Sequence, residues 1–198
     1  MIKIAFIGRQ RSGKTTGANA LKLHFLATGG LDWESTRVIT SSFGKAMKEE
    51  FELFTGEEFD KREHRKMIQL FGQLHRHYDD YIWIRQVEQD MHHAQLIGAS
   101  HFIIDDVRQQ NEVDFCKENG FILVYVDVPL VDLHTRCLDL EEDFTPSHST
   151  EMVEQFYEDA DLRIVNSNDT LIEQFEETLI EMVEAIIEHK QEVENNGD

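Results

Sequence analysis

The residues with the clearest chemical meaning lie at the start of the chain. An apolar run over residues 2–7 meets Gly8, and after four more residues Gly13, Lys14 and Thr15 follow. Glycines let the backbone curl so that successive N–H groups point at one phosphate group. The lysine can reach β and γ oxygens, and the threonine hydroxyl can ligate Mg²⁺. The spacing predicts a nucleoside triphosphate site formed by Gly8, Arg11, Ser12, Gly13, Lys14, Thr15 and Thr16.

A second chemical group follows a later apolar run, in the segment FIIDDVR. Ligands of parallel sheets bind at the carboxyl ends of the strands, where Asp105, Asp106 and Arg108 would lie. We expect Asp106 to join Thr15 in holding Mg²⁺, although either aspartate could instead cap the following turn. Arg108 could bind a second phosphate group through two parallel hydrogen bonds.

Alternating strands and helices must position these residues. The pattern predicts strands over 2–7, 37–41, 101–105, 122–128 and 162–165, with helices over 14–28, 43–54, 61–96 (broken near 78–80), 111–119, from Pro129 onward and over 170–189. Short apolar strands separated by helices indicate an α/β fold with a parallel sheet covered on both faces. We expect a single domain over residues 1–190 and an acidic tail over 191–198.

The charge of the chain restricts its partners. A formal net charge of −20 argues against nucleic acids and anionic membranes, because both attract clustered basic residues. A small phosphorylated ligand stays compatible if the basic side chains converge on one cleft. The absence of a basic leader or a long apolar run, together with only two cysteines, predicts a cytoplasmic location.

Several segments resemble a known family. IIDDVRQQNEVDFCKENGFILVYVDVP resembles the D-V-R-x-x-N-E signature of phage-type deoxynucleoside monophosphate (dNMP) kinases, with Asn111 and Glu112 on fixed positions. RKMIQLFGQLHRHYDDYIWIRQV is similar to that family's R-x-x-x-Q-x-x-G…R…W stretch, and SFGKAMKEEF to its F-A-x-x-L-K segment. SHSTE and DLRIVNSNDTLIEQ resemble its closing segments, so the resemblance runs from Met1 to about Phe175.

This resemblance implies a three-layer fold of the P-loop nucleoside-monophosphate-kinase type, with an acceptor-binding helical region near 43–98 and a small lid near 136–150. It also implies transfer of phosphate from ATP, with Mg²⁺, to a dNMP. A monophosphate dianion requires converging guanidinium groups, a glutamine can pair with a base edge, and a tryptophan ring can stack. The implied acceptor residues are Lys48 (with Lys45 as the alternative), Arg65, Gln69, Arg76, Trp83 and Arg108.

The resemblance also implies donor and catalytic roles. Asn166 and Thr170 would contact the donor adenine, or they could belong to an N-terminal cap of the last helix. The implied catalytic residues are Lys14, Asp106, Arg108 and Arg136. Because acidic residues follow Arg136, Arg11 or Arg9 could serve in place of a second lid arginine.

Other functions remain open at this point. A P-loop kinase of dephospho-coenzyme A or phosphomevalonate would keep the phosphate loop, and so would a nucleotide-binding protein without catalysis. A GTP-dependent switch would need an N-K-x-D-like segment, which NSND is not. The family resemblance further suggests a bacteriophage origin, hence the host cytoplasm, and a homodimer formed through residues 61–96.

Overall fold

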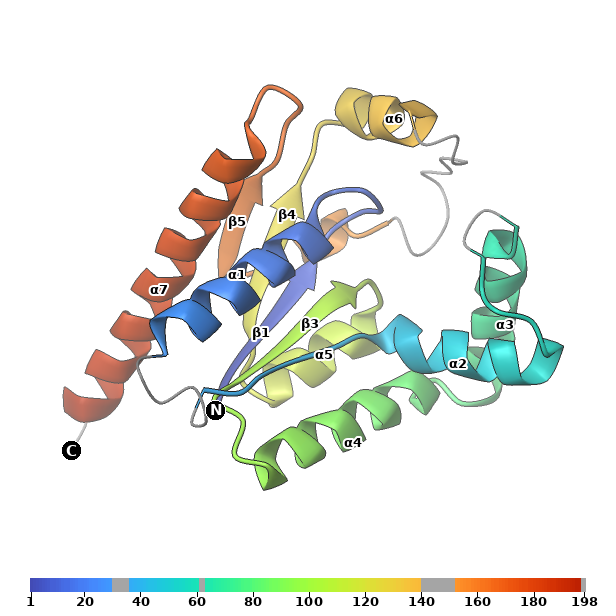
Figure 1. The fold of residues 1–198 in the computed structure, drawn as a ribbon, viewed down its shortest axis with the longest axis horizontal. Helices are drawn as coiled ribbons and strands as arrows, with labels where there is room; N and C mark the ends of the chain where they lie inside the picture. Colours follow the sequence, from blue (N-terminus) through green and yellow to red (C-terminus); the bar gives the residue numbers. More distant parts are fainter. Residues whose placement is uncertain (30–35, 61–62, 140–151, 197–198) are drawn as a thin grey trace.

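The computed structural model describes residues 1–29, 36–60, 63–139 and 152–196. Strands and helices alternate along most of this chain (Figure 1). The elements are β1 (Ile2–Ile7), α1 (Lys14–Thr28), β2 (Val38–Ser41), α2 (Phe43–Thr55), α3 (Arg65–Tyr78), α4 (Ile82–Leu96), β3 (His101–Val107), α5 (Gln110–Glu118), β4 (Ile122–Asp127), α6 (Leu130–Asp139), a short 3-10 helix η2 (Glu154–Phe156), β5 (Leu162–Val165) and α7 (Ile172–Asn196).

The strands form one five-stranded sheet in the order β2-β3-β1-β4-β5, and every neighbouring pair is parallel. The central strand β1 places Ile4 opposite Ile103 of β3 and Ile122 of β4. Because β1 and β3 are neighbours, the residues that follow them meet at the same edge of the sheet. This parallel sheet with helices around it confirms the predicted fold class.

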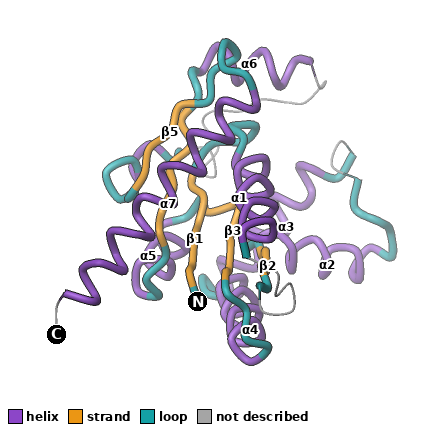
Figure 2. Tube along the Cα trace, turned by 60° about the vertical axis from the view of Figure 1, so that its left-hand side comes forward, coloured by secondary structure: helices purple, strands orange, loops and turns teal. Residues whose placement is uncertain are grey.

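Each face of the sheet has its own hydrophobic core, because successive residues of a strand point to opposite faces. Ile4 and Phe6 of β1 pack in a cluster with residues of α1 and α7. Ala5 and Ile7 belong to a second cluster, with residues of α2, α4 and α5. Figure 2 shows the strands enclosed between these helices. The three-layer arrangement therefore follows from alternation within apolar strands.

Helix boundaries agree well with the predicted breaks. Helix α3 ends at Tyr78 and α4 begins at Ile82, so the helical region is broken where Asp79 and Asp80 stand. The carbonyl of Pro129 accepts hydrogen bonds from the first turn of α6, as expected for a proline that opens a helix. Helix α7 continues to Asn196, so part of the predicted acidic tail is helical. Glutamate, glutamine and lysine favour helices, which accounts for the extension.

Helices α2 and α3 extend away from the sheet, on the side opposite to α7 (Figure 1). They belong to the predicted acceptor-binding region. Three apolar side chains of α3, Met67, Leu70 and Leu74, are more than half exposed, and the predicted homodimer through this region stays a prediction.

Of the predicted lid, residues 136–139 lie in α6, and 140–150 lie outside the described residues. No helix among the described residues is long and apolar enough to cross a membrane.

Candidate active site

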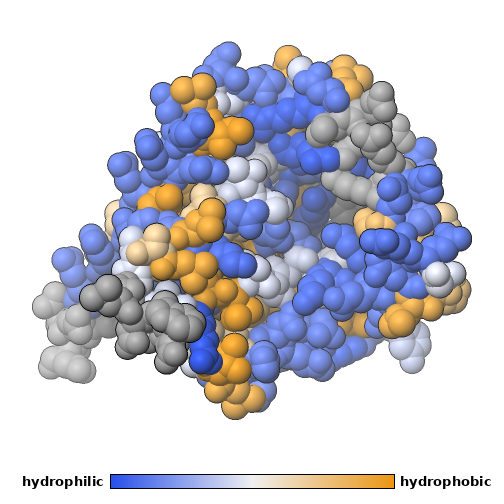
Figure 3. All heavy atoms as spheres, in the orientation of Figure 1, coloured by the Kyte–Doolittle hydropathy of each residue, from blue (hydrophilic) through white to orange (hydrophobic). Residues whose placement is uncertain are grey.

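A cavity of about 1060 Å³ lies at the carboxyl ends of β1 and β3. Figure 3 shows the molecule hollowed between α6 and α2, with hydrophilic residues around the hollow. Most of the residues predicted from the sequence line this cavity: Arg11, Gly13, Lys14, Thr15, Thr16, Lys48, Arg65, Gln69, Arg76, Asp106, Arg108, Arg136, Asn166 and Thr170. Gly8, Ser12 and Trp83 are not among its lining residues.

The phosphate loop joins β1 to α1 and has an unusual backbone. Arg11, which is not a glycine, has φ 60°, and Gly13 has φ 102°. Left-handed residues of this kind allow successive N–H groups to surround an anion. A Cβ atom on Gly13 would lie 2.3 Å from Nδ2 of Asn166, and other residues rarely adopt its φ, so glycine is favoured there. The hydroxyl of Ser12 is buried without a partner among the described residues. These features fit a loop shaped for the phosphates of ATP.

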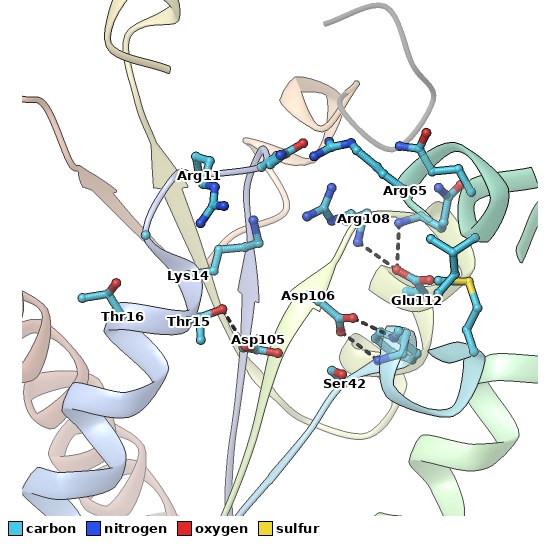
Figure 4. Close-up of a pocket in the computed structure, with 18 of the residues that line it drawn as sticks. Arg11, Lys14, Thr15, Thr16, Ser42, Arg65, Asp105, Asp106, Arg108 and Glu112 are labelled. Atoms are coloured by element: carbon cyan, nitrogen blue, oxygen red, sulfur yellow. Dashed lines mark hydrogen bonds between the residues drawn. The ribbon is translucent and has the colours of Figure 1, made fainter. Parts of the chain in front are cut away.

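Lys14 lies inside this loop and is 5% exposed. Its ammonium group donates hydrogen bonds to the carbonyl oxygens of Gly8, at 2.8 Å, and Arg9, at 2.5 Å. Figure 4 shows Lys14 at one wall of the cavity, with Arg65 and Arg108 on the facing side. The lysine therefore stands where a cation could meet phosphates bound between the two walls.

The two adjacent aspartates of β3 have different partners. The hydroxyl of Thr15 donates a hydrogen bond of 2.8 Å to Asp105, whereas Asp106 accepts hydrogen bonds from the backbone N–H groups of Phe43, at 2.8 Å, and Gly44, at 2.7 Å. Asp106 thus caps the N-terminus of α2. From the sequence we expect Asp106 to join Thr15 at Mg²⁺, but in the structure the carboxylate hydrogen-bonded to Thr15 is that of Asp105. Hydroxyl and carboxylate oxygens are ligands suited to Mg²⁺.

The cavity environment also changes the acidity of Asp106. Burial raises its pKa to about 6, and the nearby charges of Glu112 and Asp105 add to this effect. The hydrogen bonds from Gly44 and Phe43 oppose the shift, because they favour the ionised form. The pKa of Asp106 therefore lies well above the value of 3.8 that is ordinary for an aspartate.

The far wall of the cavity carries the predicted acceptor residues. Arg65, Gln69 and Arg76 come from α3, and Lys48 comes from α2. Arg76 forms an ion pair with Glu112 of α5 at 3.1 Å. Lys45, the alternative to Lys48, is exposed and is not a lining residue.

The structure places Trp83 in the hydrophobic core instead of the cavity wall. The residue is 2% exposed and packs with residues such as Ile84 and Val87 of the same helix. Its ring therefore has no route to a ligand in this arrangement. Phe59, whose ring centroid lies 5.9 Å from the ammonium of Lys48, lines the cavity together with Phe43 of α2.

Arg136 connects two loops at the opposite end of the cavity. Its guanidinium donates hydrogen bonds to the carbonyl of Arg11 at 3.0 Å, the carbonyl of Asn166 at 2.9 Å and the side chain of Asn168 at 2.7 Å. Burial lowers the pKa of Arg136, and the charge of Asp132 partly opposes this. Arg136 therefore holds the phosphate loop against the loop before α7.

Asn166 completes this connection. Its side chain donates a hydrogen bond of 2.8 Å to the carbonyl of Ser12. Because α7 begins only at Ile172, Asn166 is not its N-cap. The hydroxyl of Thr170 lies 3.0 Å from that of Ser167. Of the two predicted donor-adenine residues, Asn166 thus lies beside the phosphate loop, and Thr170 lines the same cavity.

Several residues at this site have no role predicted from the sequence. Glu112 contacts Arg76, and the side chain of Asn111 donates a hydrogen bond of 2.6 Å to the carbonyl of Asp80. Both residues stand in the D-V-R-x-x-N-E segment, and this segment is the feature of the sequence that points to them. Further unassigned lining residues are Gln10, Ser42, Met47, Phe59, Gln73 and His77.

Comparisons with solved structures identify the fold. Shikimate kinases from Acinetobacter baumannii and Aquifex aeolicus match with TM-scores of 0.55 and 0.54 and identities of 13% and 16%. The first match covers 96% of this chain and 95% of the other, and the second covers 94% and 98%. An APS kinase from Mycobacterium tuberculosis, in complex with AMPPNP and APS, has a TM-score of 0.53 at 16% identity and covers 92% and 97%. No protein-family model matches, and no curated protein is similar in sequence. The chain therefore has the fold of small P-loop kinases.

Proposed function

We propose that this protein transfers the γ-phosphoryl group of ATP to a deoxynucleoside monophosphate, which yields ADP and the deoxynucleoside diphosphate. The observation that carries the proposal is one cavity with a phosphate loop on one wall and, on the other, arginines from α3 and Arg108, which directly follows β3. The fold shared with solved kinases and the resemblance of the D-V-R-x-x-N-E and R…Q…R…W segments support it.

The distribution of charge supports phosphorylated ligands. The chain has 39 acidic and 19 basic residues, yet among the described residues the cavity is lined by seven basic side chains and four acidic ones. A site that must hold a triphosphate and a monophosphate needs this excess of positive charge. The seven basic residues are Arg11, Lys14, Lys48, Arg65, Arg76, Arg108 and Arg136.

In the donor half, the phosphate loop and Lys14 would bind the ATP phosphates. Thr15 and Asp105 would hold Mg²⁺, with Asp105 replacing the predicted Asp106 because it already contacts the Thr15 hydroxyl. When bound, Mg²⁺ neutralises phosphate charge. Arg136 and Asn166 would keep the base-binding loop against the phosphate loop, which makes Arg136 a positioning residue for the donor.

In the acceptor half, Arg65, Arg76 and Arg108 would surround the monophosphate. An oxygen of that phosphate would attack the γ-phosphorus, and the bond between the γ-phosphorus and the oxygen of ADP would break. This reaction requires mainly that the two nucleotides are aligned and that charge on the moving group is compensated. Lys14 and Arg108 line the cavity from opposite walls and would supply that compensation.

An ADP-release assay with an acceptor panel tests the proposal. ATP and Mg²⁺ are combined with each of the four dNMPs, AMP, dephospho-coenzyme A and phosphomevalonate in separate reactions. We expect turnover with at least one dNMP. Turnover with dephospho-coenzyme A or phosphomevalonate alone would keep the donor half and overturn the acceptor assignment. Binding of ATP without turnover in any reaction would indicate a non-catalytic protein and contradict the proposal.

A further inference from the structure

Glu112 is a buried acid at the junction of three elements. The residue belongs to α5, and only 2% of its surface is exposed. Its Oε1 atom lies 3.1 Å from Nη2 of Arg76 on α3. Its Oε2 atom accepts hydrogen bonds from the backbone N–H groups of Arg108, at 2.8 Å, and Gln109, at 3.1 Å. Figure 4 shows Glu112 beside Arg108, at the edge of the cavity.

The two oxygens of this carboxylate have separable tasks. Through Oε2, Glu112 completes a capping box with Gln109 at the start of α5. A glutamine can serve in such a box as well as a glutamate, so this task does not require a negative charge. Through Oε1, Glu112 pairs with an arginine that stands 36 positions earlier in the chain. Only this second task needs the charge.

A buried charge must be compensated by an opposite charge, and for Glu112 the guanidinium of Arg76 supplies it. The side chain of Glu112 is 3% exposed and that of Arg76 is 22% exposed, so water screens the pair weakly. A guanidinium carries five N–H donors, and the contact at Nη2 uses only part of this capacity in Arg76, which lines the cavity. The pair therefore fixes the orientation of Arg76 without consuming its capacity to bind a phosphate.

We propose that Glu112 is a positioning residue of the acceptor-phosphate site. Its carboxylate holds the side chain of Arg76 and the backbone of Arg108 in one arrangement, so that both guanidinium groups meet the same monophosphate. An arginine held in place before binding loses less conformational freedom when the ligand arrives, which increases affinity. The inference rests on the proposed function, since it names how that function's acceptor site is built.

Glu112→Gln tests the inference most sharply. The glutamine oxygen still accepts the hydrogen bonds of Arg108 and Gln109, but the amide then presents N–H donors to Arg76. We expect KM for the dNMP to rise about tenfold or more, the effect of losing one charge-assisted hydrogen bond. KM for ATP is expected to change less than about twofold, because the hydrogen bonds of Glu112 to other described residues reach Arg76, Arg108 and Gln109 and not the donor loops. Glu118→Gln, the same exchange at an exposed position of α5, is the matched control and leaves both KM values unchanged.

A double-mutant cycle separates positioning from general damage. If Glu112 acts through Arg76, then Glu112→Gln raises KM for the dNMP little further in a protein that already carries Arg76→Ala. Glu112→Asp provides a second variant in case the glutamine variant does not fold. It keeps the charge, but its shorter side chain cannot reach both Arg76 and the backbone, so KM for the dNMP rises in the same direction.

The outcomes distinguish a failure of the proposed function from a failure of the role of Glu112. Wild-type protein that shows no turnover with any dNMP overturns the proposed function itself. Wild-type turnover, combined with an unchanged KM for the dNMP in both Glu112 variants, overturns only the role of Glu112. Equal increases of KM for ATP and dNMP would show a general structural defect and also contradict the inference.

Discussion

The hydroxyl of Thr15 and the carboxylate of Asp105, 90 positions apart, form a hydrogen bond of 2.8 Å. The contact arises because β1 and β3 are neighbours, with Ala5 opposite Ile104. Successive residues of β3 point to opposite faces of the sheet. Ile103 packs in the hydrophobic cluster that contains residues of α1 and α7, and Ile104 packs in the cluster that contains residues of α2, α4 and α5. Two residues later along the strand, Asp105 therefore faces α1 and Asp106 faces α2. This alternation decides which aspartate meets the phosphate-loop threonine.

The first prediction concerns Mg²⁺. Asp105→Asn is expected to reduce kcat/KM roughly 10- to 100-fold and to raise the Mg²⁺ concentration required for half-maximal rate, because the residue beside Thr15 loses its charge. The measurement is the initial rate of ADP release across a Mg²⁺ titration. Asp106→Asn is the neighbouring comparison and should leave the Mg²⁺ requirement almost unchanged. The opposite pattern would restore Asp106 as the metal-binding residue.

The second prediction is a pH dependence of stability that originates at Asp106. Its folded-state pKa of about 6 lies above the ordinary value of 3.8, so between these values the folded protein holds a proton that the unfolded chain releases. Ionisation of Asp106 therefore lowers the free energy of unfolding as pH rises through this range. Asp106→Asn removes this titration, although the amide loses one hydrogen bond from Phe43 or Gly44 at every pH.

Chemical denaturation of both proteins at pH 4.5 and pH 7 measures this effect. The free energy of unfolding of Asp106→Asn minus that of the wild type should increase by on the order of 1 kcal/mol or more from pH 4.5 to pH 7. The readout is how this difference in unfolding free energy changes with pH, because the lost hydrogen bond lowers the stability of the variant equally at both pH values. A difference that stays constant would show that Asp106 does not titrate in this range.

The third prediction separates two lysines of α2. Both lysines are exposed, but only Lys48 lines the cavity. We expect Lys48→Ala to raise KM for the dNMP several-fold, because a cation near a dianion is lost, and Lys45→Ala to have no effect. Calorimetric titration with the dNMP gives the affinities directly. Equal losses in the two variants would point to the net charge of the helix as the cause.

The fourth prediction concerns the contact between α2 and α3. A Cβ atom on Gly72 would lie 2.3 Å from the sulfur of Met47, so α2 packs directly on this glycine. Gly72→Ala should force the helices apart, lower the free energy of unfolding by about 1–3 kcal/mol and raise KM for the dNMP. Adding Met47→Ala should recover part of the stability, because the obstructing side chain is removed. A Gly72→Ala protein as stable as the wild type would contradict this packing.

Much of the fold could be predicted from the sequence, because the apolar strands and the phosphate loop carry local signals. The break between α3 and α4 was predictable for the same reason, as Asp79 and Asp80 interrupt the apolar pattern. The choice between Asp105 and Asp106 was not predictable in this way. Their alternation is visible in the sequence, but which face carries α1 depends on the strand order.

Other residues could not be assigned because side-chain direction depends on packing. Trp83 stands with Val87, Met91 and Ala94 at helical spacing, which indicates a buried position. The family resemblance implied a ligand-binding role instead, and the prediction followed the resemblance. For Glu112 the local pattern is incomplete, because a glutamate three residues after a cap predicts only a capping box. Its pairing with Arg76 requires α3 and α5 to meet in space, which no local pattern indicates.

The most direct test of the account follows the transferred phosphorus. ATP labelled at the γ-phosphate is mixed with Mg²⁺, wild-type protein and the dNMP that the acceptor panel selects, and the products are separated. We predict that the label appears in the β-phosphate of the deoxynucleoside diphosphate in step with ADP formation, and that Lys14→Ala and Arg108→Ala each slow its appearance by roughly 10²–10³-fold. Label that appears only as inorganic phosphate would contradict the account, because the acceptor would then be water.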